Sequence, residues 1–176
     1  MKKIVFILIL CSVFCLDVLS QIKINKLDVK GQKEGLWITP SIYGVSECYY
    51  KNGVLSGTYM EFNKERNMLT LGEYNDGQIC GNWYHFGKQG HLMISFKNIQ
   101  KNTGHFLTDK DGKEYIPDYQ CYYIGYYSNG TIKEEGIILW YEGDDPVSDC
   151  SSEYGLWKYY DEDGNLTNTV NHQQYP

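Results

Sequence analysis

The hydrophobic and polar positions of the chain follow the two-residue period of β-strands. Leu92, Ile94 and Phe96 occupy alternate positions of one segment, so their side chains would share one face of a strand. The dipeptides at 52–53 and 76–77 are Asn-Gly and Asp-Gly, which favour the positive φ angles of tight hairpin turns. The pattern therefore predicts consecutive antiparallel hairpins.

A short glycine-aromatic motif recurs along the chain. Its three clear copies consist of Gly, three residues, Gly, one residue and an aromatic residue, and they span 31–37, 53–59 and 77–83. These copies begin 22 and then 24 residues apart, a regular spacing that indicates a repeat architecture. Weaker copies, which lack the upstream glycine, begin at Gly104, Gly125 and Gly155.

The composition supports an all-β fold and excludes several classes of function. The 176 residues include 18 Gly and 17 Tyr but no alanine, the best helix former. With 42% hydrophobic and 22% charged residues, the chain can bury a core, and its length suits a single domain. A net charge of −6 without a Lys/Arg cluster argues against nucleic acid or anionic lipid as a partner.

Residues 1–20 have the pattern of a secretory signal peptide. Lys2 and Lys3 precede an uncharged run over 4–16, which is shorter than the roughly 20 apolar residues that span a bilayer. Small side chains at Val18 and Ser20 favour cleavage before Gln21.

Lipoprotein processing at Cys11 or Cys15 is the less favoured alternative, because bulky side chains precede both thiols. The remaining domain, 21–176, contains no second apolar run and would carry a charge of −7 after loss of two lysines and one aspartate. We expect it in the periplasm or outside the cell, without a membrane span.

Four cysteines remain in the exported chain: Cys48, Cys80, Cys121 and Cys150. An even number of thiols in an oxidising compartment permits disulfides, and all three pairings are open. The local scheme, which joins Cys48 to Cys80 and Cys121 to Cys150, is weakly favoured because each bridge closes a loop of about thirty residues. The alternative is that some of these thiols are free and buried.

Three segments carry a resemblance to a known family. They are Asn25-Lys-Leu-Asp with Gly31-Gln-Lys-Glu-Gly-Leu-Trp, then Tyr127-Ser-Asn-Gly-Thr-Ile-Lys-Glu-Glu-Gly, and Gly155-Leu-Trp-Lys-Tyr-Tyr with Asp163-Gly-Asn-Leu. These segments resemble MORN-repeat proteins, and most closely the bacterial variant of secreted and antitoxin-labelled proteins. The resemblance covers nearly the whole mature chain and is weakest over 87–120. It implies an elongated, twisted antiparallel sheet of one hairpin per repeat, used as a scaffold or binding surface.

The sequence contains no recognisable grouping for catalysis, a cofactor or a metal. Its histidines, His85, His91, His105 and His172, lack the close spacing of metal ligands or catalytic bases. The segments at 109–112 and 161–164 contain Asp-x-Asp-Gly, but their acidic residues do not occupy the positions of an EF-hand loop. We therefore interpret both segments as hairpin turns and predict no enzyme activity.

Aromatic side chains are the one feature that suggests a ligand surface. Tyrosine and tryptophan provide rigid anchors for proteins and stacking surfaces for sugars. The competing interpretation is that these rings cover a sheet with little other core. The candidate binding residues are Trp83, Tyr122, Tyr123, Tyr126, Tyr127, Trp157, Tyr159 and Tyr160.

The leading hypothesis is an exported, non-enzymatic β-repeat protein that binds an unidentified protein partner or serves as a scaffold. One alternative is an immunity or antitoxin-like protein that neutralises a toxin outside the cytosol, and this rests on the family label alone. A second is a glycan-binding surface protein, given the tyrosine-rich face. The open edges of a repeat sheet would also permit an edge-to-edge homodimer.

Overall fold

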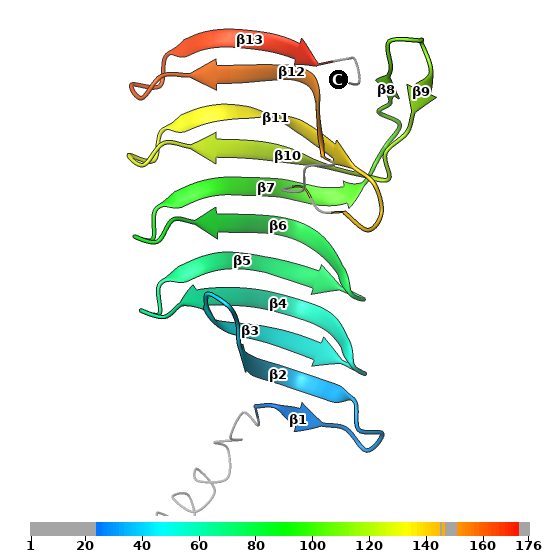
Figure 1. Ribbon diagram of the computed structural model, residues 1–176, viewed down its shortest axis with the longest axis vertical. Helices are drawn as coiled ribbons and strands as arrows, with labels where there is room; N and C mark the ends of the chain where they lie inside the picture. Colours follow the sequence, from blue (N-terminus) through cyan, green and yellow to red (C-terminus); the bar gives the residue numbers. More distant parts are fainter. Residues whose placement is uncertain (1–23, 145, 147–150, 173–176) are drawn as a thin grey trace, which may run out of the picture.

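The computed structural model describes residues 24–144, 146 and 151–172 and confirms the all-β prediction. Over these residues, eleven strands form one antiparallel sheet with hairpin connections, and the sheet remains open (Figure 1). In sheet order the strands are β1 (Lys26–Leu27), β2 (Lys33–Pro40), β3 (Gly44–Lys51), β4 (Val54–Asn63), β5 (Met68–Asn75), β6 (Gln78–Phe86), β7 (Leu92–Lys101), β10 (Tyr119–Tyr126), β11 (Ile132–Trp140), β12 (Ser152–Tyr160) and β13 (Leu166–His172).

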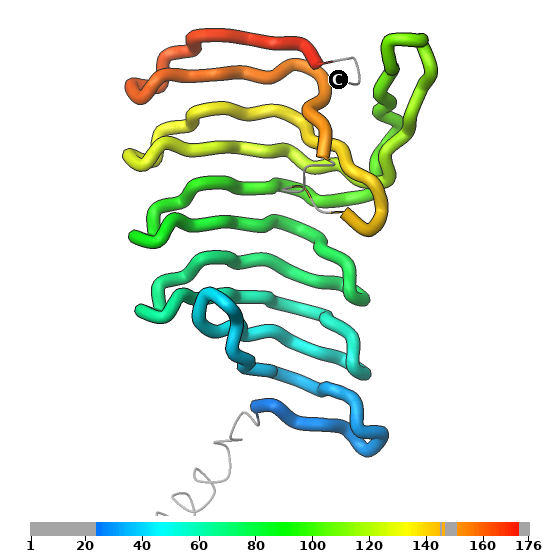
Figure 2. The backbone as a smooth tube through the Cα atoms, in the orientation of Figure 1, coloured from blue at the N-terminus to red at the C-terminus, as the bar shows by residue number. Residues whose placement is uncertain are grey.

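A small hairpin, β8 (Leu107–Thr108) with β9 (Glu114–Tyr115), interrupts the succession between β7 and β10. It projects from one end of the stacked strands (Figures 1 and 2). The Asn102 side-chain amide holds its base, because Nδ2 donates hydrogen bonds to the carbonyls of His105 at 2.7 Å and Pro117 at 2.8 Å. Leu107 of β8 is buried, and the His105 and Tyr154 rings lie with centroids 4.7 Å apart, so the insertion contacts β12.

The same end of the sheet carries the tight turns that the sequence predicted. Asn52 and Gly53 have φ angles of 51° and 81°, and Asp76 and Gly77 have 48° and 81°. Two successive positive φ angles define the turn whose twist matches that of a hairpin. The Asn-Gly and Asp-Gly dipeptides therefore set the register of β3 with β4 and of β5 with β6.

Longer turns at the opposite end, and one in the β8–β9 hairpin, use a side chain as their anchor. Asp161 Oδ1 accepts hydrogen bonds from the backbone N–H groups of Asp163 at 3.1 Å and Asn165 at 2.8 Å. Asp109 and Asn63 accept equivalent pairs of bonds in their own turns. The Asp-x-Asp-Gly segments are hairpin turns, as the sequence predicted, and their first aspartates serve backbone amides.

The second glycine of each clear repeat has a positive φ, and in the second and third copies it lies beside a β-bulge. Gly57 and Gly81 have φ angles of 114° and 66°, and the pairing register shifts beside each of them. A bulge changes the direction in which the following side chains point. Here the aromatic residue two positions after the glycine lies over the preceding strand. Among the three weaker copies, Gly155 has this conformation, with φ of 67°, whereas Gly125 lies within β10 without a positive φ. Gly104 lies in the insertion, so the repeat is interrupted there.

Two tryptophans cover glycines on neighbouring strands. A Cβ atom on Gly72 would overlap the Trp83 ring, and one on Gly136 would overlap the Trp157 ring. Trp83 Nε1 donates a hydrogen bond to the Glu73 carbonyl, and Trp157 Nε1 donates one to a carbonyl at the equivalent place on β11, both at 3.1 Å. Each indole is therefore buried with its polar atom satisfied.

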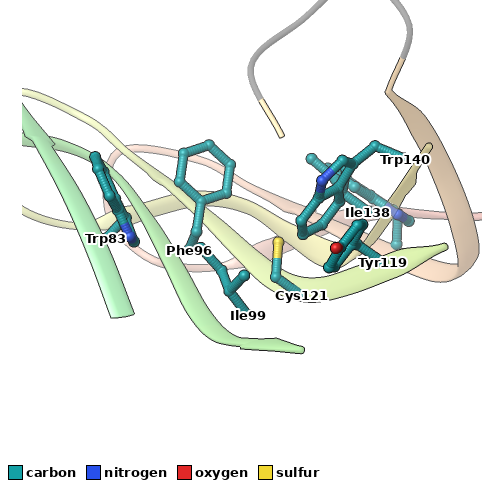
Figure 3. Close-up of a cluster of buried hydrophobic side chains, with 8 residues drawn as sticks. Trp83, Phe96, Ile99, Tyr119, Cys121, Ile138 and Trp140 are labelled. Carbon is teal, nitrogen blue, oxygen red and sulfur yellow. The ribbon is translucent and has the colours of Figure 1, made fainter. Parts of the chain in front are cut away.

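The core lies along one face, which we call the aromatic face. Residues Trp83, Phe96 and Tyr123 are successive cross-strand neighbours on it, and Trp157 stacks on Tyr123 with ring centroids 5.4 Å apart. Figure 3 shows Phe96 between Trp83 and the stacked Tyr119–Trp140 pair. The buried cluster consists of Trp83, Phe96, Ile99, Tyr119, Cys121, Ile138, Trp140 and Trp157.

The predicted disulfides are not formed by the described cysteines. Cys48, Cys80 and Cys121 are free thiols, and Cys150 lies outside the described residues. Cys48 is on β3 and Cys80 on β6, so β4 and β5 separate them. Three strand spacings of about 4.8 Å amount to about 14 Å, whereas a disulfide requires Cα atoms within about 7 Å.

The signal-peptide prediction, residues 1–20, lies outside the described residues. Within the part of the chain that the structure describes, no segment forms a helix with the length and hydropathy needed to cross a membrane.

Candidate binding surface on the aromatic face

The structure distributes the predicted binding residues over both faces of the sheet. Trp83, Tyr123, Trp157 and Tyr159 lie on the aromatic face. Tyr122, Tyr126 and Tyr160 lie on the other face, and Tyr127 lies in the turn after β10, where its hydroxyl donates to the Tyr160 carbonyl at 2.8 Å. The eight side chains therefore do not form one surface, because adjacent residues in a strand point to opposite sides.

The two predicted tryptophans are part of the core. Trp83 is 7% exposed and Trp157 is 2% exposed, so most of each ring is unavailable to a partner. Tyr123 and Tyr159 are half-buried beside them. The interpretation of these rings as packing is correct for the tryptophans, while the tyrosines also reach the surface.

A hollow of about 570 Å³ opens on the aromatic face between β10 and β13. We call it the terminal hollow. Its apolar lining is Tyr123, Ile138 and Trp157, and its polar lining is Glu134, Ser151, Ser152, Glu153 and His172.

Two carboxylates, those of Glu134 and Glu153, line the terminal hollow, and the Lys133 ammonium group lies 3.8 Å from Glu134 Oε1. The Tyr123 hydroxyl donates a hydrogen bond to Glu134 Oε1 at 3.2 Å. Burial, followed by the charge of Glu134, raises the pKa of Tyr123 well above its usual range. The pKa of Tyr159 is raised in the same direction by burial and then by Glu153 and Glu134. Both tyrosines therefore remain neutral at physiological pH, beside the Glu134 and Glu153 side chains.

His172 closes one side of the terminal hollow. Its Nε2 atom lies 3.0 Å from Glu153 Oε2, which is within ion-pair distance, although this buried atom forms no hydrogen bond with any described residue. The Trp157 and His172 rings meet edge to face, with centroids 6.1 Å apart. The Glu153 side chain is 44% exposed and thus accessible to a group entering from solvent.

A second hollow of about 290 Å³, the middle hollow, lies nearer the centre of the sheet. It has a similar lining, with Tyr74, Tyr119 and Trp140 as rings and Glu142 and Asp144 as carboxylates. However, the Lys101 ammonium group already lies 4.0 Å from the centroid of the Tyr119 ring and donates to its hydroxyl at 2.8 Å. The middle hollow therefore has a cation of the chain's own beside it.

The tyrosines of the opposite face are engaged with charged neighbours. Tyr160 donates to Glu135 Oε1 at 2.7 Å, and Lys97 donates to the Tyr84 hydroxyl at 3.0 Å. Burial and then a hydrogen bond with Glu135 raise the pKa of Tyr122 to about 12. These pairs satisfy the hydroxyls and leave a solvated polar surface with scattered apolar residues.

Sequence reasoning did not identify Glu134, Glu153 or His172 as site residues. Glu153 and His172 are 19 positions apart and meet because β12 pairs with β13, while Glu134 pairs with Tyr159 from the other side. Only a correct strand register brings these residues together. Among the described residues, no group of three or more His, Cys, Asp and Glu side chains is arranged to hold a metal ion.

Comparison with known protein families and with curated proteins finds no match. A search of solved structures finds a Glycosylation Associate Protein (Gap123) complex from Streptococcus agalactiae, with a TM-score of 0.35 and 15% sequence identity. The similarity covers 88% of this chain but 25% of that one. At this TM-score, the similarity carries no argument about function.

Proposed function

We propose that this protein is an exported, non-enzymatic binding module that holds a protein partner against its aromatic face, at the β10–β13 end of the sheet. The observation that carries the proposal is the terminal hollow, where half-buried rings and two carboxylates occur together, one of them on the exposed Glu153 side chain. Protein-binding sites concentrate their energy in such partly buried aromatic anchors surrounded by polar groups.

Charge indicates what kind of partner would fit. The chain has a net charge of −6, and both hollows on the aromatic face contain two carboxylates. A basic partner surface would be attracted to this face and would be oriented by it. Export through the signal sequence at 1–20 would place that partner in the periplasm or outside the cell.

Adjacent tyrosines on β12 provide a matched test. Tyr159→Ser removes a ring from the aromatic face, while Tyr160→Ser removes one from the opposite face. The tagged protein and both variants would be used to capture proteins from envelope and culture-supernatant fractions, with stoichiometry measured by mass spectrometry and affinity by calorimetry.

We expect one stoichiometric partner whose binding is weakened at least tenfold by Tyr159→Ser and is retained by Tyr160→Ser. Equal binding by both variants, or loss only with Tyr160→Ser, would contradict the proposal. A polysaccharide captured in place of a protein would also contradict it and would favour the glycan-binding alternative.

A further inference from the structure

The first hairpin contains a cation held in a corner between two rings. Trp37 lies two residues after Gly35, which has a positive φ, and Tyr50 is the cross-strand partner of that glycine. Their rings meet edge to face, with centroids 6.1 Å apart and planes at 70°. The Lys33 ammonium group, two residues before the glycine, lies 4.7 Å from one ring centroid and 4.5 Å from the other.

The last hairpin has the same two-ring corner. Trp157 lies two residues after Gly155, and His172 is the cross-strand partner of that glycine. These rings also meet edge to face, with centroids 6.1 Å apart and planes at 73°. The first and last repeats thus present equivalent ring pairs, and the terminal hollow is built on the second of them.

In the last hairpin, the position equivalent to Lys33 is occupied by a residue of opposite charge. Two residues before Gly155 is Glu153, where the first hairpin has Lys33. The intermediate repeats have apolar residues at this position, Leu55 and Ile79. Among the described residues, the first hairpin and the middle hollow each have a lysine over a ring, and no lysine or arginine lies over a ring of the terminal hollow. The cation of the chain nearest to its carboxylates is Lys133, whose ammonium group lies 3.8 Å from Glu134 Oε1 and leaves Glu153 to His172.

We propose that the terminal hollow binds the ammonium group of a lysine side chain supplied by the partner protein. This inference rests on the proposed function and names the group that the site recognises. The ammonium would enter the corner formed by the Trp157 and His172 rings, the counterpart of the corner that holds Lys33, and it would pair with Glu153 and Glu134. An ion pair between an ammonium and a carboxylate is stronger where both groups are partly desolvated. The lysine stem would lie along Ile138 and Tyr123.

The direct test is an NMR titration of the purified protein with N-acetyl-lysine N-methylamide. Its neutral control is the norleucine analogue, which has the same alkyl stem without the charge. We expect the lysine compound to shift the Trp157 indole N–H signal saturably, and the norleucine compound to leave it unchanged at the same concentrations. Equal shifts from both compounds, or no shift from either, would overturn the proposal.

Two substitutions at position 153 separate the role of charge from that of folding. Glu153→Gln should weaken lysine binding at least fivefold, while the matched Glu162→Gln, in the exposed turn after β12, should not change it. Glu153→Lys should abolish binding, because its own ammonium group would occupy the corner as Lys33 does. A Glu153→Lys variant that is folded, as shown by its amide spectrum, and still binds the lysine compound would contradict the proposal.

Failure of this inference is distinguishable from failure of the proposed function. If partner capture depends on Tyr159 but not on Glu153, the protein binds a partner through the aromatic face without a lysine anchor. If the lysine compound binds and no protein is captured, the site recognises an ammonium group but the proposed function is wrong.

Discussion

At the scale of single residues, glycines determine where the large rings can lie. Gly72 and Gly136 have no side chain, and the Trp83 and Trp157 rings occupy the space above them. The sequence motif contains the glycine two positions before the ring and the aromatic residue itself. It does not contain the glycine beneath the ring, which lies on the preceding strand. Sequence analysis therefore predicted the repeat without predicting the contact that packs it.

Gly72→Ala should destabilise the protein because its Cβ would overlap the Trp83 ring. Overpacking of this kind costs about 1–3 kcal/mol, which chemical denaturation would measure. The control is the double variant with Trp83→Leu, in which a smaller side chain leaves room for the new methyl group. If Gly72→Ala costs as much in the Trp83→Leu background as in the natural protein, the contact is not the cause.

Arg66 occupies a turn position that glycine occupies in related turns. Its φ is 66°, and its N–H donates to the Asn63 carbonyl as those of Gly130 and Gly164 donate in theirs. Its guanidinium group pairs with Glu47 at 2.9 Å. Alanine and glycine would both lose this ion pair, but only glycine would relieve the backbone strain. Arg66→Gly should therefore be more stable than Arg66→Ala by about 1–2 kcal/mol. Thermal unfolding of both variants would show equal stability if the strain is negligible.

At the scale of elements, the hairpin turns make the stability of the fold depend on pH. Hydrogen bonds from the Asn165 side chain and backbone lower the pKa of the Asp161 carboxyl below its ordinary value. A carboxyl group with a lowered pKa in the folded state adds stability above its unfolded pKa, about 3.9, and this stability is lost as the pH falls through the folded value.

Asp161→Asn should keep the turn, since Asn63 anchors its own turn with an amide oxygen. The variant should be folded at pH 7 and should lose less stability than the natural protein between about pH 4 and pH 2. Urea unfolding across this range measures the difference. If the free energy of unfolding falls equally with pH in the two proteins, the Asp161 carboxylate does not contribute to stability.

At the scale of the whole molecule, the fold was more predictable than the site. Turn dipeptides and alternating residues are local signals, and they indicated the antiparallel hairpins. The alternation also implied that Tyr159 and Tyr160 point to opposite sides, but not which side is the core. The cysteine count suggested disulfides, yet Cys48 and Cys80 lie on strands too far apart to be joined. Such relations depend on register and strand order, which neither composition nor motif spacing contains.

The thiols provide a test of the overall strand arrangement. Burial raises the pKa of the Cys121 thiol to about 12, and Cys80 is less buried than either Cys48 or Cys121. In the native protein at pH 8, iodoacetamide should therefore modify Cys80 first and Cys121 slowly, because the thiolate is the reactive form. Alkylation after unfolding without reductant should label all three. A Cys48–Cys80 crosslink found by peptide mapping would contradict the strand order.

The central claim is that a protein partner binds the aromatic face at the β10–β13 end. The most direct measurement is photo-crosslinking in the cells that produce the protein, with benzoyl-phenylalanine placed at position 159 or, separately, at position 160. The account predicts a protein adduct from position 159, with a lysine within the crosslinked segment of the partner, and none from position 160. Adducts from position 160 alone, or equally from both positions, would contradict it.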